Sequence, residues 1–189
     1  VNMEDVSNPA YWKRRIETCP SNERHMSIYR TTKQNWIDIE NNHKHILEQI
    51  IKPNESIIDC ACGWGRLLSL LPKDWKGEYV GIDISPDFIR QAKLEYPRYA
   101  HSFYVGDLRD DLSRYILPLP TTDTHCHSIS PRKLDWAILI SIKPMIIRNM
   151  GMDVWNSMYN NIKKVADNIL YLEYQVEDYN PTKYVTTQP

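Results

Sequence analysis

Apolar positions in the first half of the chain change from a helical to a strand-like spacing. In residues 22–50 they recur every three or four positions, which predicts a helix with one apolar face. A shorter helix is expected before it, over residues 9–18, because Asn8 and Pro9 form a helix start. Later runs rich in β-branched and aromatic residues predict strands over residues 56–60, 79–84 and 102–106.

Helices are expected between these strands and again in the second half of the chain. The spacing predicts helices over residues 65–71, 86–96 and about 155–165. Two further strands are predicted over residues 135–141 and 168–175. Residues 116–133 have no apolar period and are expected to form a long loop.

Strands that alternate with helices predict an α/β fold. We expect a Rossmann-like, doubly wound and mostly parallel sheet with helices on both faces. In such sheets, ligands bind outside the carboxyl ends of the strands.

Length and composition narrow the class of protein. The 189 residues suit a single domain, so we expect one domain over 1–189. The 23 Lys and Arg against 24 Asp and Glu give no strong nucleic-acid signal. No apolar run approaches the length of a membrane span, so we expect a cytoplasmic protein without membrane contact. No metal site is expected, because the His125-Cys126-His127 run lacks a second ligand pair.

The strongest motif is the segment between the first two predicted strands. It reads Ile-Ile-Asp-Cys-Ala-Cys-Gly-Trp-Gly-Arg over residues 57–66, and its small residues would let the backbone approach a ligand at a helix start. Asp83 follows Gly63 by 20 residues, which suits an acid that binds the hydroxyls of a ribose. With Asp59 and Asp107, three acids are expected at neighbouring strand ends, lining one crevice.

The glycine spacing argues against two common nucleotide sites. A dinucleotide-binding turn would carry a third glycine where this chain has Leu68, and the phosphate-binding loop that ends in Gly-Lys-Ser or Gly-Lys-Thr is absent. A nicotinamide-dependent reductase is therefore disfavoured. Three acids suit a cationic, hydroxylated ligand better than a pyrophosphate.

These residues resemble the class I S-adenosylmethionine-dependent methyltransferases, in particular small stand-alone members of the kind found in phages. The resemblance covers about residues 55–175 and implies S-adenosyl-L-methionine as cofactor. It implies that Asp83 holds the ribose, that Asp107 and the following amide meet the adenine, and that the strand over residues 134–141 ends facing the methyl group. The residues expected to bind the cofactor are Asp59, Ala61, Cys62, Gly63, Trp64, Gly65, Arg66, Asp83, Ile84, Asp107, Leu108 and Ile140.

The chain departs from the family pattern at two places. Ala61 stands where the family has its first glycine, which is a mild change because alanine is nearly as small. The family sheet ends in an antiparallel hairpin, whereas only 14 residues follow Gln175. We therefore expect a minimal or truncated C-terminal hairpin, with Tyr184–Thr187 as one edge strand. The resemblance also implies that residues 1–50 form a helical lid over the cofactor-binding core.

The acceptor of the methyl group is less well defined than the cofactor. The paired prolines of amino-methylating DNA enzymes and the Pro-Cys of C5-methylating enzymes are both missing, which favours a small-molecule acceptor. His25 and Tyr29 are candidate catalytic residues in the lid. Lys143 and Arg148 are candidates on a loop expected after the strand over residues 135–141, and two cations there would suit an anionic acceptor.

Two alternative functions stay open at this point. The chain could be a catalytically silent S-adenosylmethionine-binding subunit that supports a partner protein, or it could methylate a nucleic acid or a protein. Cofactor binding without turnover on any acceptor would distinguish the silent subunit. The sequence does not define an oligomeric state.

Overall fold

The computed structural model describes residues 6–18, 32–116, 132–173 and 185–186. Within these residues, six strands form one sheet in the order β3-β2-β1-β4-β5-β6. Their bounds are β1 Ile57–Cys60, β2 Tyr79–Asp83, β3 Phe103–Val105, β4 Leu134–Ile140, β5 Ala166–Leu172 and β6 Val185–Thr186. The first five strands are parallel, as the sequence predicts.

Strand β6 forms the far edge of the sheet and is the antiparallel member. Its Val185 and Thr186 lie opposite Leu170 and Ile169 of β5. The expected edge strand near Tyr184–Thr187 is therefore confirmed over the two residues that are described.

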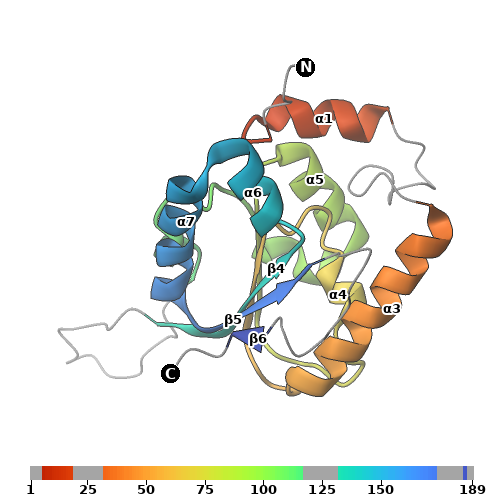
Figure 1. Cartoon of the computed structure of the whole chain (residues 1–189). Helices are drawn as coiled ribbons and strands as arrows, with labels where there is room; N and C mark the ends of the chain where they lie inside the picture. The colour runs from red at the N-terminus through yellow and green to blue at the C-terminus, as the bar shows by residue number, and fades with distance from the viewer. Residues whose placement is uncertain (1–5, 19–31, 117–131, 174–184, 187–189) are drawn as a thin grey trace.

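Helices cover both faces of the sheet (Figure 1). Their bounds are α1 Pro9–Glu17, α3 Lys33–Ile50, α4 Leu67–Leu70, α5 Pro86–Glu95, η1 Pro97–Ser102, η2 Leu112–Tyr115, α6 Lys143–Met150 and α7 Met152–Val165. One apolar cluster joins α7 and η2 to the sheet, and a second joins α3, α4 and α5 to the opposite face. The expected doubly wound architecture is confirmed.

Local sequence explains where several helices begin. The Asn8 side chain accepts a hydrogen bond from the Ala10 N–H at 2.9 Å, and Pro9 occupies the first turn of α1. Thr32 is extended and caps α3, so this helix begins at Lys33 and not at residue 22 as predicted, and residues 22–31 lie outside the described residues. Ser85 caps α5 in the same way.

The segment after β4 corrects one prediction. Lys143 and Arg148 were expected on a loop, but both belong to α6. Pro144 lies in the first turn of this helix, where a missing N–H costs nothing, and Gly151 ends it with a φ of 92°. The helix lies with α1 beyond the carboxyl ends of the strands (Figure 1).

Candidate functional site

The turn after β1 forms the floor of the site. It has positive φ angles at Ala61 (64°), Gly63 (55°) and Gly65 (85°). The left-handed conformation costs a non-glycine residue about 1–2 kcal/mol, so Ala61 holds a strained backbone. A hydrogen bond from the Cys62 N–H to the Ile82 carbonyl, at 3.0 Å, ties the turn to the end of β2.

Asp83 is the last residue of β2, and its carboxylate faces this turn. Its Oδ2 accepts the Gly63 N–H at 2.9 Å, and its Oδ1 accepts the Ser85 N–H at 2.8 Å. Burial raises the pKa of Asp83 to about 6, although these two hydrogen bonds lower it. Each oxygen keeps a further lone pair for a ligand, which suits two ribose hydroxyls.

Gly63 leaves open space where a ligand would lie. A Cβ added at this position meets nothing within 4 Å, and the residue lines the cleft described below. An unfilled cradle beside a carboxylate with spare acceptor capacity fits the ribose and the amino-acid end of S-adenosylmethionine. The donor set therefore fits the cofactor that the resemblance implies.

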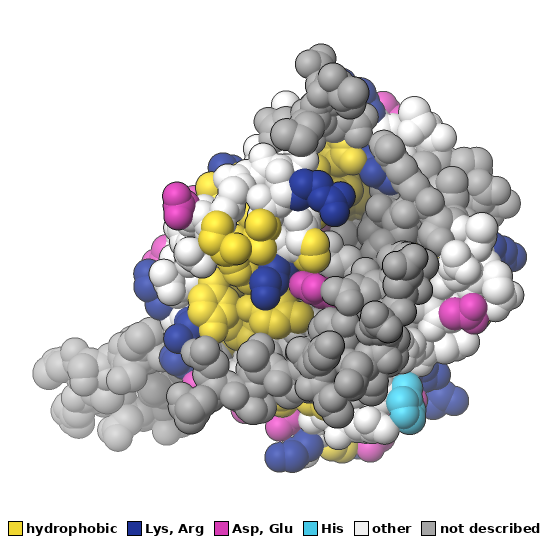
Figure 2. Space-filling view, viewed as in Figure 1, with side chains coloured by type: hydrophobic (Ala, Val, Ile, Leu, Met, Phe, Trp, Pro, Cys, Tyr) yellow, Lys and Arg dark blue, Asp and Glu magenta, His cyan; other side chains and the backbone are white. Residues whose placement is uncertain are grey.

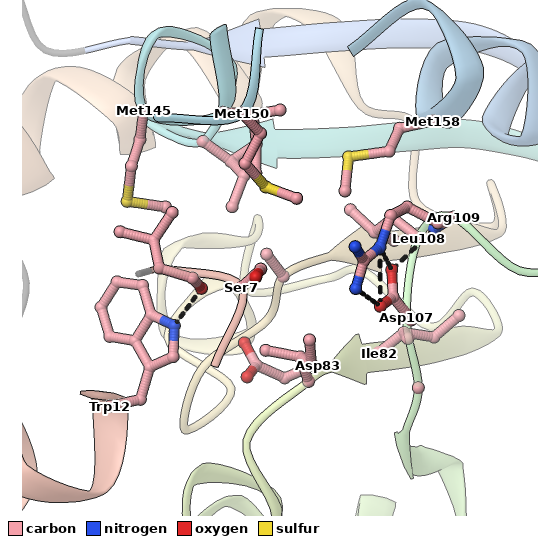
Figure 3. Close-up of a pocket in the computed structure, with 16 residues that line it drawn as sticks. Ser7, Trp12, Ile82, Asp83, Asp107, Leu108, Arg109, Met145, Met150 and Met158 are labelled. Atoms are coloured by element: carbon pink, nitrogen blue, oxygen red, sulfur yellow. Dashed lines mark hydrogen bonds and ion pairs between the residues drawn. The ribbon is translucent and has the colours of Figure 1, made fainter. Parts of the chain in front are cut away.

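Asp107 lies after β3 and is engaged by Arg109 (Figure 3). The Arg109 N–H donates to Oδ1 at 2.8 Å, and the guanidinium Nε reaches both carboxylate oxygens, at 3.0 and 2.9 Å. Partial burial raises the pKa of Asp107, but the Arg109 hydrogen bonds and charge outweigh it and leave the pKa below its usual value. An adenine amino group would approach a carboxylate that is already held by a cation.

A cleft of about 290 Å³ opens between the strand ends, α1 and α6. Its described lining is Trp12, Ala61, Gly63, Asp83, Phe88, Ile140, Ser141, Ile142, Pro144, Met145, Arg148 and Asn149. A smaller apolar pocket of about 60 Å³ shares Trp12, Ala61, Asp83, Ile142 and Met145 with it. The smaller pocket also contains Ile84, Asp107, Leu108 and Arg109. Three methionines face these residues across it (Figure 3).

The predicted cofactor residues therefore divide into two groups. Those that line the cleft or the pocket are Ala61, Gly63, Asp83, Ile84, Asp107, Leu108 and Ile140. Those that line neither are Asp59, Cys62, Trp64, Gly65 and Arg66. The residues of the second group are all buried.

The sequence predicts that Asp59 lines one crevice with Asp83 and Asp107. This prediction is wrong for Asp59, which lines neither the cleft nor the pocket. Asp59 precedes the last residue of β1, and its Oδ2 accepts the Tyr79 hydroxyl at 2.8 Å within the protein. Burial raises the pKa of Asp59 to about 7, while the Tyr79 hydrogen bond and the Arg66 charge lower it.

Arg66 ties the turn to α3. Its Nη2 lies 3.3 Å from His43 Nδ1, and its guanidinium lies 4.7 Å from the centroid of the Trp36 ring. Burial and the Arg66 charge lower the pKa of His43 to about 3, so the imidazole is neutral at neutral pH. Trp64 packs against Phe88 at 5.8 Å between ring centroids and is also a core residue.

The four candidate catalytic residues lie in different parts of the chain, and only one of them lines the cleft in the described residues. His25 and Tyr29 lie outside the described residues. The Lys143 ammonium lies over the rings of Trp155 and Tyr171, 5.7 and 4.8 Å from their centroids, and does not line the cleft. Arg148 lines the cleft and is exposed. Apolar and basic side chains are intermixed over α6 and α7 (Figure 2).

Sequence reasoning missed several lining residues. Trp12 of α1 lines both the cleft and the pocket, and Ser141 has a positive φ of 56° directly after β4. Local spacing identified α1 as a helix but did not show which side chain would face the site. The backbone strain at Ser141 has no sequence signal, although strain of this kind is concentrated at ligand sites.

The segment that contains the turn after β1 is similar to a known protein family. A family model described as a methyltransferase domain matches residues 57–124. Over these residues, about a third of the chain, the sequence is similar to a methyltransferase domain. The resemblance seen in the sequence is confirmed, and the domain implies S-adenosylmethionine as the cofactor.

Curated relatives match the chain over short stretches. A Mycobacterium tuberculosis protein named as a methyltransferase is 39% identical over 57 residues, which are 30% of this chain and 34% of that protein. The ribosomal protein L11 methyltransferase of Burkholderia ambifaria is 40% identical over 52 residues, 28% of this chain and 17% of that enzyme. The match thus spans about a third or less of the relatives' length.

A solved structure supports the fold. DesVI of Streptomyces venezuelae aligns with a TM-score of 0.51 at 13% identity, covering 86% of this chain and 61% of DesVI. In the described residues, no helix is long and apolar enough to cross a membrane. The described part of the chain also holds no group of three or more His, Cys, Asp or Glu residues placed to bind a metal ion.

Proposed function

We propose that the protein transfers the methyl group of S-adenosylmethionine to a small molecule that carries an anionic group. The observation that carries the proposal is the Asp83 carboxylate, which the Gly63 N–H holds at the edge of the cleft. Both residues belong to the segment that matches a methyltransferase domain. We also infer that residues 1–189 act as one domain, with α1 as part of a lid.

The described residues supply binding and alignment. Asp83 orients the ribose through its two oxygens, and Gly63 permits close approach of the methionine end. When bound, the cofactor supplies a methyl carbon whose bond to sulfur breaks as the acceptor's electron pair attacks in line, leaving the bonding electrons on sulfur. Trp12, Ile142 and Met145 keep water from this space.

Arg148 supports the anionic acceptor. It is the exposed cation in the described lining of the larger cleft, and no other described residue forms a hydrogen bond or ion pair with it. A planar guanidinium binds a carboxylate or phosphate with two parallel hydrogen bonds. Lys143 does not share this role, because its ammonium packs on two aromatic rings.

The test compares the two cations of α6. S-adenosylhomocysteine formation is measured with a panel of small carboxylates and phosphates, and cofactor affinity is measured by calorimetry. Arg148→Lys should lower kcat/KM for an anionic acceptor by about tenfold or more with unchanged cofactor affinity. Lys143→Gln is the control and should leave both quantities close to wild type.

Three results would contradict the proposal in different ways. Cofactor binding without turnover on any acceptor would favour the silent subunit. Turnover on a protein or nucleic acid alone would move the acceptor to another class. A loss of cofactor affinity in Arg148→Lys would assign Arg148 to the cofactor carboxylate instead.

A further inference from the structure

Trp12 presents an aromatic surface to the cleft from α1. The side chain is half-buried, and it lines both the large cleft and the smaller pocket. Its indole N–H donates to the Val6 carbonyl at 3.0 Å, a bond drawn in Figure 3. The indole is thus anchored at one edge, while another part of it faces the cavity.

Two neighbouring rings pack against the indole. The Tyr11 ring centroid lies 4.9 Å away in an edge-on arrangement, and the Phe88 centroid lies 5.9 Å away. Phe88 is only 3% exposed and is itself backed by Trp64. A ring fixed in this way loses little conformational freedom when a ligand packs on it, so it is preorganised for binding.

The positive charge of Arg148 determines which of the ligands that pack on an aromatic ring can bind in the cleft. Indole faces attract cations and other aromatic rings. Arg148 lines the same cleft and repels a cationic acceptor, whereas it attracts an anion. The combination of Trp12, Phe88 and Arg148 therefore favours a flat aromatic ring that carries a carboxylate.

We infer that the methyl acceptor is an aromatic carboxylic acid, with its ring against Trp12 and its carboxylate toward Arg148. The inference rests on the proposed function and adds the chemical class of the substrate. The Asn149 side chain, which also lines the cleft, donates one amide hydrogen to the Met145 carbonyl at 2.7 Å and keeps its oxygen for a substituent of the ring.

The experiment uses matched pairs of acids that differ only in their ring. The protein is saturated with S-adenosylhomocysteine and titrated with 2-, 3- and 4-hydroxybenzoate and with the corresponding hydroxycyclohexanecarboxylates. At least one aromatic acid should bind roughly fivefold to tenfold more tightly than its saturated counterpart, because only the aromatic ring stacks on the indole.

Variants then assign the preference to particular side chains. Trp12→Leu should abolish the preference for the aromatic acid, and Trp12→Phe should restore most of it because a ring is again present. Arg148→Gln should weaken both members of a pair by a similar factor. Equal affinity for the two members, a preference that survives Trp12→Leu, or no binding of any acid to the protein saturated with S-adenosylhomocysteine would overturn the inference. Failure of S-adenosylhomocysteine itself to bind would instead overturn the proposed function.

Discussion

The backbone N–H of Gly63 donates a hydrogen bond to the Asp83 carboxylate at 2.9 Å, across 20 positions of sequence. This bond joins the turn after β1 to the end of β2. It places the acid expected to hold the ribose directly beside the glycine that we expect to give the cofactor room.

Replacing Asp83 should remove most of the cofactor affinity. Asp83→Asn keeps the shape of the side chain but loses the charge that strengthens hydrogen bonds with ribose hydroxyls. Because each charge-assisted bond is worth about 1.5–3 kcal/mol, the Kd for S-adenosylhomocysteine should rise by about a hundredfold or more. Calorimetry checks this, with Asp87→Asn as the control, since Asp87 pairs with Arg90 on the surface of α5. A rise of less than about twofold in the Kd would place the ribose elsewhere.

Cofactor affinity should also depend on pH through Asp83. Only the ionised carboxylate accepts hydrogen bonds with both oxygens, and the pKa of Asp83 is raised to about 6. Affinity should therefore be full above this pKa and decrease as the pH falls through about 6. Calorimetric titrations at several pH values should show this decrease in the wild type but not in Asp83→Asn. The same decrease in both proteins would assign the titration to another group.

The open space at Gly63 predicts a steric effect on binding. Gly63→Val places a branched side chain into the cleft and should abolish cofactor binding. Gly151→Val is a matched control, because Gly151 also has a positive φ and open space around its Cβ but does not line the cleft. Both variants should lose stability in thermal unfolding because valine is strained at a positive φ, whereas only Gly63→Val should lose the ligand. Normal binding by a folded Gly63→Val would contradict the assignment of the turn.

Hydrogen exchange should show which N-terminal helix acts as a lid. S-adenosylhomocysteine should slow exchange in α1, since Trp12 lines the cleft. Exchange in α3 should change much less, because none of its residues lines the cleft or the pocket. Unchanged exchange in α1 would make it a structural cap.

Asp59 should make the fold less stable as the pH rises. Its pKa is raised from 3.8 to about 7, so the folded state holds a proton that the unfolded state has lost between these values. The free energy of unfolding should decrease across this window by an amount on the order of a few kcal/mol, because one pKa unit corresponds to about 1.4 kcal/mol. Urea unfolding at pH 4 to 8 should show a flatter profile for Asp59→Asn, whose amide does not titrate. Parallel profiles for the two proteins would exclude this contribution.

Much of the fold was predictable because its determinants are local. Asn8 with Pro9, and Ser85 with Pro86, mark helix starts within a few residues. The helix over Lys143–Met150 differs from the predicted loop because Pro144 lies in its first turn, where proline is well suited to begin a helix.

The sequence predicts a residue of the cleft correctly where the position of that residue at the end of a strand is enough to place its side chain. Asp83 ends β2 and faces the cleft, whereas Asp59 lies one residue before the end of β1 and bonds to Tyr79. Trp12 reaches the cleft only because α1 packs on α5 through Phe88, a contact between distant parts of the chain. Long-range packing of this kind leaves no mark in local spacing.

The left-handed backbone at Ala61 shows what the first position of the turn requires. Alanine there carries a strain of about 1–2 kcal/mol, while glycine would cost about 0.5–1 kcal/mol in the entropy of the unfolded chain. The two costs differ by only about 1 kcal/mol, so alanine is tolerated at this position, whereas a β-branched residue would add further strain. A search pattern that demands glycine at this point will pass over chains that form the same turn with alanine.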